Sequence, residues 1–455
     1  MKSKLFPWLI LICLSIFGCT QIIKPANKAT VSSLSKKEVE KTYCIIPKKK
    51  SLNFLSGSNQ NSKSFHQLLK KIKKQRIKLS FIEKSALWLL YQMNVSPDVC
   101  SPSSRLQLIV SHKGSEPLYW DFHHPFTKNK KEISYYYPYL DGVEYLLKHF
   151  KSKKSLIQLS SLLDRHLPKK FKVTKSLEKT INMKKANLYK SKPFKNVFFK
   201  EAEPLKQNES YPKLQFKSLV KKYKKLRKSS KRRKAYGKQK LKKASISRHL
   251  FPFKTKSDFS SPPIKCNIDL SLYQHSIFLI NSEEVSSNIF GLEEDDSYFI
   301  AASSQLLSGP ISPLFGTFLI KGKKPQKTPT ICLIKNQNKK SNITLISYKG
   351  RDPGQHVYNL IQQGVHQSNS LMDLDIFLKG PRKIFLVNPL RVLIEPLDKN
   401  EKNLLRFRKK NIPLYPVRNL GHIMAYGQFN IKQQNGFILD KRSLEKLSCL
   451  EKNDP

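Results

Sequence analysis

The chain has 455 residues, and 39% of them are hydrophobic, which is enough for two or three domains with packed cores. Its 85 Lys and Arg outweigh 32 Asp and Glu, and the formal net charge of +53 predicts attraction to polyanions such as lipid headgroups, wall polymers or nucleic acid. The seven cysteines include no C-x-x-C pair, so neither a zinc ribbon nor a thioredoxin-like centre is supported.

The first nineteen residues have the order of a secretory signal peptide. Lys2 and Lys4 precede an apolar run from Leu5 to Phe17, which is too short for the roughly 20 residues of a spanning helix. Gly18 and Cys19 end this run, and the pair resembles the lipobox of bacterial lipoproteins. The resemblance implies removal of residues 1–18, acylation of Cys19 and attachment to a membrane of the cell envelope. An ordinary cleaved signal or an uncleaved anchor, with Cys19 incidental, is the alternative.

The family analogy also bears on which membrane carries the protein. Thr20 stands where an Asp is the usual mark for inner-membrane retention, so the resemblance favours the outer membrane over the inner one.

We expect an α+β fold with two small domains joined by a disordered or partly helical polycationic linker. Lys, Ser and Asn dominate the residues after Cys19, which predicts a flexible tether over 19–63. A helix-rich α+β domain should cover 64–168, a basic linker 169–262, and a sheet-rich α+β domain 263–448.

Capping boxes and alternation predict the elements of the first domain. The pattern S/T/D-x-x-E/Q occurs at Ser80, Asp141 and Ser155, and each should begin a helix with an apolar face. Apolar alternation from Leu106, a turn at Lys113–Glu116 and the run ending at Phe122 predict a β-hairpin.

The basic linker is the strongest local signal. Fifteen of the 27 positions from Lys217 to Lys243 are cationic, which argues against a compact core there. Phe216, Val220 and Tyr223 recur at helical spacing, so this stretch should form a basic amphipathic helix that lies on an anionic lipid surface. A solvated linker is the alternative. The predicted anion-binding residues are Lys221, Lys222, Lys224, Lys225, Arg227, Lys228, Lys231, Arg232, Arg233 and Lys234.

Short apolar runs predict the strands of the second domain. They include 277–280, 298–300, 316–320, 331–334, 343–346, 384–387 and 392–394, and Asn388–Pro389 should turn the last pair into a hairpin. One helix should begin at Asp352–Pro353, with Asp352 as N-cap and proline in the first turn, and a second should cover 399–409.

Five cysteines would remain beside Cys19 after export. An oxidising compartment permits up to two disulfides among them, but the sequence does not give their pairing. Cys100 and Cys332 lie in or beside apolar stretches, where buried thiols are equally consistent with the pattern.

Two groups of polar residues are weak candidates for catalysis. Asp352, His356, Asp373, Asp375 and His422 form a hydrolase or metal site only if the fold gathers them into one cleft. His366 lies ten residues after His356, too far along one helix to share a metal with it.

The second group lies at the end of the predicted hairpin. Asp121, His123 and His124 are more consistent with an exposed loop than with a ligand set. The tyrosines from Tyr135 to Tyr139 are more typical of core packing than of a stacking site.

These observations favour an envelope lipoprotein with a non-catalytic role that binds or organises an anionic envelope component. Anionic lipid or an envelope polymer is the expected partner, nucleic acid is second, and the oligomeric state is open. No cofactor, metal or catalytic residue is expected. A hydrolase that acts on an envelope polymer through the C-terminal domain is the alternative, and a surface adhesin or nucleic-acid binder is the third.

Overall fold

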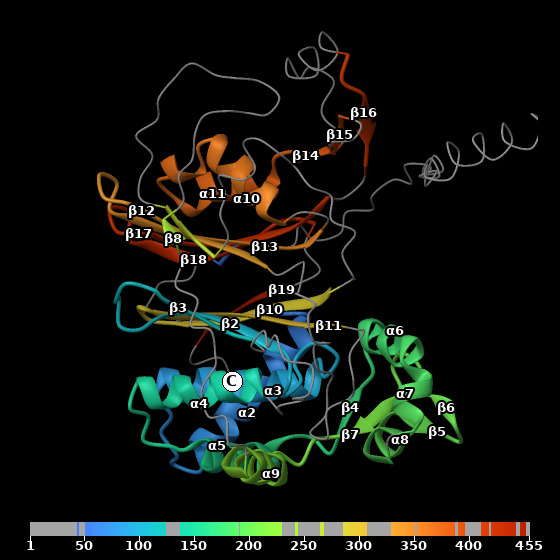
Figure 1. The fold of residues 1–455 in the computed structure, drawn as a ribbon. Helices are drawn as coiled ribbons and strands as arrows, with labels where there is room; N and C mark the ends of the chain where they lie inside the picture. The colour runs from blue at the N-terminus through green and yellow to red at the C-terminus, as the bar shows by residue number, and fades with distance from the viewer. Residues whose placement is uncertain are drawn as a thin grey trace, which may run out of the picture. The chain divides into compact units, whose positions relative to one another are not determined.

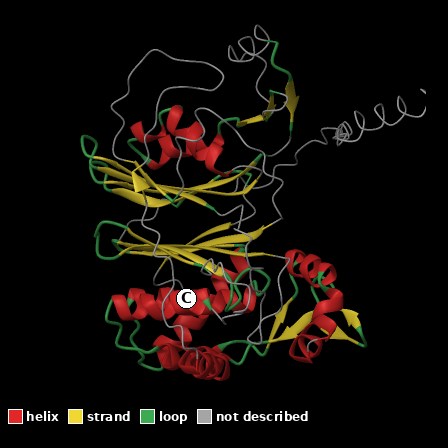
Figure 2. Cartoon of the chain, in the orientation of Figure 1, coloured by secondary structure: helices red, strands yellow, loops and turns green. Residues whose placement is uncertain are grey.

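Two six-stranded antiparallel sheets face one another, and each carries helices on its outer side (Figures 1 and 2). The structure is a computed structural model. The residues it describes are 43–44, 51–123, 137–190, 192–229, 242–243, 264–267, 285–306, 329–350, 353–386, 390–395, 411–417, 420–442 and 446–451.

The first sheet combines strands from both halves of the chain. In spatial order it contains β19 (Lys446–Glu451), β1 (Ser51–Ser56), β10 (Val285–Glu294), β11 (Ser297–Leu306), β2 (Arg105–Ser111) and β3 (Leu118–Phe122). The second sheet contains β18 (Gln434–Leu439), β17 (Gly421–Phe429), β13 (Ser341–Gly350), β12 (Thr330–Asn336), β9 (Ile264–Cys266) and β8 (Lys242–Lys243).

Side chains that alternate along the strands fill the space between the sheets. Ile289 and Ile300 of the first sheet share a buried cluster with Ile346 and Met424 of the second. At Gly291 the sheets approach so closely that a Cβ atom would lie 3.0 Å from the ring of Phe437. The inter-sheet layer is therefore a packed core.

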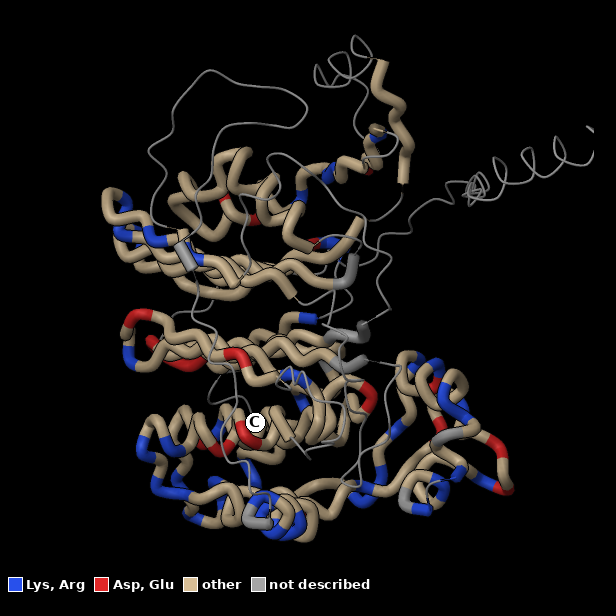
Figure 3. Tube along the Cα trace, in the orientation of Figure 1, with Lys and Arg blue, Asp and Glu red and all other residues tan. Residues whose placement is uncertain are grey.

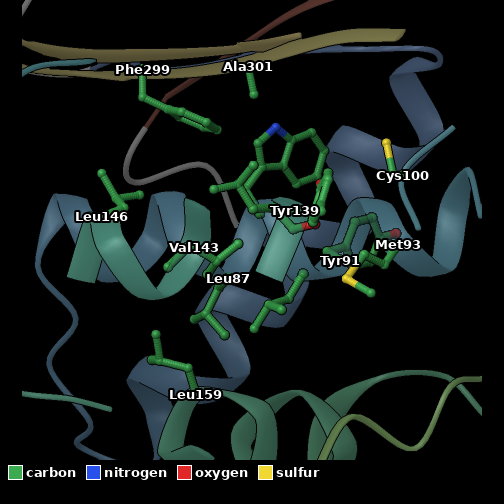
Figure 4. Packing of buried hydrophobic residues seen from close by; sticks show 14 of the residues in the cluster. Leu87, Tyr91, Met93, Cys100, Tyr139, Val143, Leu146, Leu159, Phe299 and Ala301 are labelled. Atoms are coloured by element: carbon green, nitrogen blue, oxygen red, sulfur yellow. The ribbon is translucent and has the colours of Figure 1, made fainter. Parts of the chain in front are cut away.

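Helices cover the outer face of the first sheet. They are α2 (Asn59–Lys74), α3 (Phe81–Val95), α4 (Pro138–His149), α5 (Leu156–His166) and α9 (Phe216–Ser229). Almost every residue of α3 is buried, because this helix lies between the sheet and the other helices (Figure 4). Capping boxes begin α3 at Ser80 and α5 at Ser155, as the sequence predicts.

The second sheet has a smaller helical cover. α10 (Pro353–Gln362) and α11 (Leu371–Lys379) pack on its outer face, with a 3-10 turn, η3 (Val365–Gln367), between them. A further small sheet contains β14 (Lys383–Leu386), β15 (Arg391–Ile394) and β16 (Leu414–Pro416).

A small module with its own core precedes α9. It contains β4 (Lys170–Lys172), α6 (Lys175–Met183), α7 (Lys185–Lys190), α8 (Lys192–Phe198), β5 (Phe199–Lys200), β6 (Glu203–Pro204) and β7 (Ser210–Pro212). Its buried residues include Leu177, Ile181, Phe194 and Tyr211.

Two separate domains are not confirmed. β2 of the predicted first domain pairs with β11 of the predicted second domain, so one sheet joins them. The described residues from 43 onwards belong to one compact unit. The predicted linker is also corrected, because residues 170–229 fold into the small module and α9; residues 230–241 and 244–263 lie outside the described residues.

Several local predictions change in the structure. The range predicted for the flexible tether, 19–63, extends too far, since β1 lies within it and pairs with both β10 and β19. The predicted helix start at Asp141 is wrong, because Pro138 begins α4 and Asp141 lies in its first turn. The hairpin of β2 and β3 is confirmed, as are a helix from Pro353 and the pairing of β14 with β15.

Three other predicted elements cannot be compared with the structure. The strands at 277–280 and 316–320 and the helix at 399–409 lie outside the described residues. No helix among the residues described is both long and apolar enough to cross a membrane.

Two disulfides are present, as the cysteine count permits. Cys44 pairs with Cys449 and Cys266 with Cys332, while Cys100 is a buried free thiol.

Candidate functional site

The inner face of the first sheet becomes polar at one end. Arg105 and Gln107 precede Ile109 along β2 at intervals of two residues, so all three share the face that contacts the second sheet. Asp121 is paired with Gln107 in the register of β2 and β3, and Ser304 is paired with Arg105 in that of β2 and β11. We call Arg105, Gln107, Asp121 and Ser304 the polar end.

An ion pair between the buried Asp121 and the partly buried Arg105 is the main charged feature of the polar end. Arg105 Nε donates to Asp121 Oδ1 at 2.8 Å, and Arg105 Nη2 donates to Asp121 Oδ2. Burial lowers the pKa of Arg105, but the charge and hydrogen bonds of Asp121 outweigh burial and raise it overall. The guanidinium is therefore charged, and its other N–H groups have no partner among the described residues.

Gln107 adds a second polar group that is only partly engaged. Its Nε2 donates to the hydroxyl of Tyr119 at 2.9 Å, whereas its buried Oε1 has no partner among the residues the structure describes. An amide oxygen and guanidinium N–H groups of the polar end thus have no hydrogen-bond partner among the described residues.

The first residues of β10 lie in the same part of the sheet. Ser287 is paired with Ser304 across β10 and β11, and Ser304 is paired in turn with Arg105. Ser286, the second residue of β10, is paired with Gln305 of β11. Two serines thus stand on the backbone positions next to the polar end, where the chain enters the sheet after 268–284.

The opposite end of the same inner face is closed by a network around Glu293, in which only the buried Oδ1 of Asn53 has no partner among the described residues. Glu293 accepts hydrogen bonds from Asn53 Nδ2 at 3.0 Å and from the Tyr426 hydroxyl at 2.9 Å. The rings of Tyr426 and Tyr298 stack with their centroids 3.8 Å apart. We call Asn53, Glu293, Tyr298 and Tyr426 the closed end.

The constellation predicted in the C-terminal part is only partly assembled. His356 and His422 lie close enough to interact electrostatically, and both are buried. Asp373 and Asp375 lie on α11 rather than on a strand, where Asp373 accepts from the backbone amide of Asn369 and Asp375 accepts from Lys379. Asp352 lies outside the described residues. The four residues that are described do not come together in one cleft.

His356 is a structural residue. Its Nε2 donates to the carbonyl of Leu420 at 2.9 Å, and burial, followed by the charge of Arg382, lowers its pKa to about 3. His366 lies on η3 rather than on α10, because Gly364 ends the helical path with φ 96°. The two histidines therefore do not share a helix.

Next to His356, charged residues form a buried cluster. Arg382 donates to Asp440 and to the carbonyl of Gly421, and Arg442 pairs with Glu395 at 2.6 Å and with Asp440 at 2.9 Å. Each charge faces an opposite charge, which is typical of a structural network.

The other polar candidates have mixed outcomes. Asp121 ends β3 as predicted and belongs to the polar end; His123 closely follows it and is partly exposed, and His124 lies outside the described residues. Tyr137 and Tyr139 pack in the core, as expected for this tyrosine run. No three His, Cys, Asp or Glu side chains come together as a metal site would require in the part of the chain that is described.

The basic helix does not present its apolar side to a lipid surface. Phe216, Val220 and Tyr223 of α9 are buried in the core of the helical layer, so this prediction is wrong. Lys and Arg recur along α9 (Figure 3), which lies beside the other helices of this layer (Figure 1). The Tyr223 hydroxyl donates to Asp141 at 2.6 Å, and Arg227 pairs with Glu144. Asp164 of α5 accepts from the first amides of α9, those of Phe216 and Lys217.

The predicted anion-binding residues are therefore divided. Lys221, Lys222 and Lys225 are exposed, Lys224 is half-buried, and Arg227 is engaged with Glu144. The side chains of Lys228, Lys231, Arg232, Arg233 and Lys234 lie outside the described residues, as does Cys19.

Sequence comparison identifies no relative, since neither a family model nor a curated protein matches the chain. Solved structures do match. The cephalosporin acylase from Bacillus halodurans is 10% identical, with a TM-score of 0.57, and the match covers 92% of this chain and 99% of that chain. Two structures of LmbA2991 also match, each over 89% of this chain and 99% of theirs. The point variant is 10% identical with a TM-score of 0.55, and the structure named HD is 9% identical with a TM-score of 0.58.

These similarities establish a shared fold and correct the functional expectation. The two facing sheets with outer helices form a fold that this chain shares with an acylase over nearly its whole length. The expectations of a non-catalytic binder and of a protein that is not an enzyme are therefore wrong, and the hydrolase ranked second is better supported. The comparisons lend no support to the assignment as a membrane lipoprotein, which rests on residues 1–20.

Proposed function

We propose that this protein is an amide-bond hydrolase whose nucleophile is a serine at the beginning of β10. The observation that carries the proposal is the position of Ser286 and Ser287 beside the polar end, in a fold shared with an acylase. Ser297 and Ser341 begin other inner strands, but each directly follows a hairpin turn at the closed end. Thr330, which begins β12, is buried at 2% exposure.

The chemistry requires the serine to become a chain end. A serine hydroxyl is a weak nucleophile until a neighbouring base takes its proton, and a free α-amine on the same residue can act as that base. In the cleavage of the chain itself, the serine hydroxyl oxygen attacks the carbonyl carbon of the preceding residue. The peptide C–N bond between the two residues breaks, which leaves an ester and a free α-amine on the serine. Water then hydrolyses the ester, which restores the hydroxyl and leaves a carboxylate on the residue before it.

Arg105 suggests the substrate class. A buried, charged guanidinium held in place by Asp121 binds a carboxylate with good geometry. We therefore propose that the amide substrate carries a carboxylate on its acyl part. An envelope peptide or polymer fits this description, although the site uses residues from both halves of the chain rather than the C-terminal part alone.

The first experiment tests processing. The protein is purified and its mass is measured under reducing conditions, together with S286A and S287A. The unmodified protein should consist of two polypeptides, the second of which begins with Ser286 or Ser287. The alanine variant of that serine should remain uncut. If both variants are cut like the unmodified protein, β10 does not supply the nucleophile.

The second experiment tests the substrate. Hydrolysis of glutaryl p-nitroanilide is compared with that of pentanoyl p-nitroanilide, which has the same chain length without the carboxylate. The carboxylate-bearing amide should be hydrolysed with the higher kcat/KM. Equal rates in the cut protein would contradict the role of Arg105.

We propose that the hydrolase acts in the cell envelope, anchored through an acylated Cys19, with the exposed lysines of α9 facing anionic lipid or polymer. The two disulfides support an oxidising compartment. The intact mass of protein extracted from membranes would show acylation at Cys19, and an unmodified N-terminus would contradict the anchor.

A further inference from the structure

One disulfide joins the first sheet to a segment beside the second sheet, and the other lies within the second sheet. Cys449 lies on β19, at one edge of the first sheet, and its partner Cys44 precedes β1. Cys266 on β9 and Cys332 on β12 face each other directly in the second sheet, with their Cα atoms 4.2 Å apart. The first sheet thus contains one end of the Cys44–Cys449 disulfide, and the second sheet contains both ends of the Cys266–Cys332 disulfide.

In the sequence, the first residues of β10 lie between the two cysteines of each disulfide. Cys44 and Cys266 precede Ser286 in the chain, whereas Cys332 and Cys449 follow Ser287. A cut at either serine would therefore leave each disulfide joining the N-terminal fragment to the C-terminal fragment.

The strands of the two fragments also interlock. In the first sheet, β1 of the N-terminal fragment lies between β19 and β10 of the C-terminal fragment. In the second sheet, β9 of the N-terminal fragment pairs with β12 of the C-terminal fragment. Separation of the fragments would expose strand edges in both sheets.

A cut changes what unfolding means for this chain. Without a covalent link, an unfolded cut protein consists of two molecules, and refolding depends on their concentration. A disulfide keeps the fragments at a high effective concentration and makes refolding unimolecular. One link is sufficient for this effect, and a second constrains the unfolded chains further.

We propose that the two disulfides are staples that hold the processed halves of this enzyme together, one at the edge of the first sheet and one within the second sheet. This inference rests on the proposed function, because it assigns the cut to the beginning of β10. The staples exist before the cut, so processing leaves a covalently joined two-fragment protein.

The test compares gels of the processed protein with and without reductant. Under denaturing, non-reducing conditions a single joined species is expected, and reductant should release two fragments. C332S and C449S should each remain joined through the other disulfide, while the double variant should separate without reductant. Two separated fragments from the unmodified protein without reductant would overturn the inference.

A variant distinguishes this inference from the proposed function. If the chain remains a single polypeptide after reduction, self-processing fails but the staples are still testable. A recognition sequence for a site-specific protease is then inserted between Asn267 and Val285 in S286A/S287A and cut in the folded protein. The halves should remain joined without reductant, and their release would contradict the staples alone.

A solution measurement gives an independent check. The urea midpoint of the cut, oxidised protein should not change over a tenfold range of protein concentration. The cut C332S/C449S protein should unfold at a midpoint that rises with concentration. A concentration-dependent midpoint in the oxidised protein would count against the inference.

Discussion

The two ends of the inner face of the first sheet differ in how their charged groups are engaged. At the closed end, Glu293 accepts from Asn53 and Tyr426, and the stacked tyrosines fill the space between the sheets. At the polar end, Asp121 occupies one side of the Arg105 guanidinium, and the remaining N–H groups have no described partner. The ends lie roughly 20 Å apart along the strands.

This difference separates a structural polar network from a candidate binding site. A fully engaged buried charge stabilises one arrangement of the sheets, whereas a charge with donors to spare can bind a ligand. Since both ends lie on the inner side of the first sheet and share β11, each provides a control for the other.

The largest expected effect comes from breaking the ion pair of the polar end. D121L leaves the Arg105 charge buried without its partner, and we expect a loss of about 3–5 kcal/mol in the free energy of unfolding. Urea unfolding followed by circular dichroism measures this loss. A loss below about 1 kcal/mol would mean that solvent reaches the guanidinium and that the polar end is not buried as described.

Replacement of both members of the pair separates stability from activity. R105M/D121L removes both charges, so most of the stability lost in D121L should return. The preference for glutaryl over pentanoyl p-nitroanilide should nevertheless fall by about 10- to 100-fold, since hydrogen bonds to a charged group contribute about 1.5–3 kcal/mol. If the double variant keeps the preference, another residue binds the carboxylate.

Substitutions at the closed end should affect stability alone. Y426F removes the hydroxyl that donates to Glu293, and we expect a loss of about 1–2 kcal/mol in the free energy of unfolding. The kcat/KM of the folded fraction should remain unchanged. A fall in kcat/KM comparable with that of R105M/D121L would remove the functional distinction between the two ends.

A third region supplies a pH-dependent change in stability that is independent of both ends. His356 is buried with its pKa lowered to about 3, so the unfolded chain binds a proton between that value and the ordinary pKa of 6.5, and the folded protein does not. Stability should therefore fall by about 1 kcal/mol per pH unit as the pH decreases below 6.5.

The corresponding variant is H356Q. Its unfolding free energy should vary less with pH between about 6.5 and 4 than that of the unmodified protein, whatever its stability at neutral pH. Identical slopes in urea titrations at several pH values would show that His356 is not the source.

Short-range patterns predicted several elements correctly. The capping boxes at Ser80 and Ser155, the hairpin of β2 and β3, and the start of α10 at Pro353 each depend on residues only a few positions apart. The missed strand β1 is buried from Leu52 to Ser56, so it lacks a clear apolar alternation, and six residues within a polar stretch are a weak signal.

The candidate site could not be predicted in the same way. The hairpin pattern indicates Asp121 as a polar residue at a strand end, but it does not indicate Ser287, which is placed beside Arg105 only through β11, nearly 200 residues away from β2. The tight pair of Arg105 and Asp121 is visible only once β2 and β3 are seen to present the same face to the second sheet.

By itself the sequence determined the local elements, the charge, the export-like N-terminus and the limit of two disulfides, since these depend on composition and on neighbouring residues. Tertiary structure alone decided that one sandwich replaces two domains, that the apolar face of α9 meets a protein core rather than lipid, and which cysteines pair. The physical reason is that an amphipathic face or a strand edge specifies only that it must be covered, and the covering partner comes from distant parts of the chain.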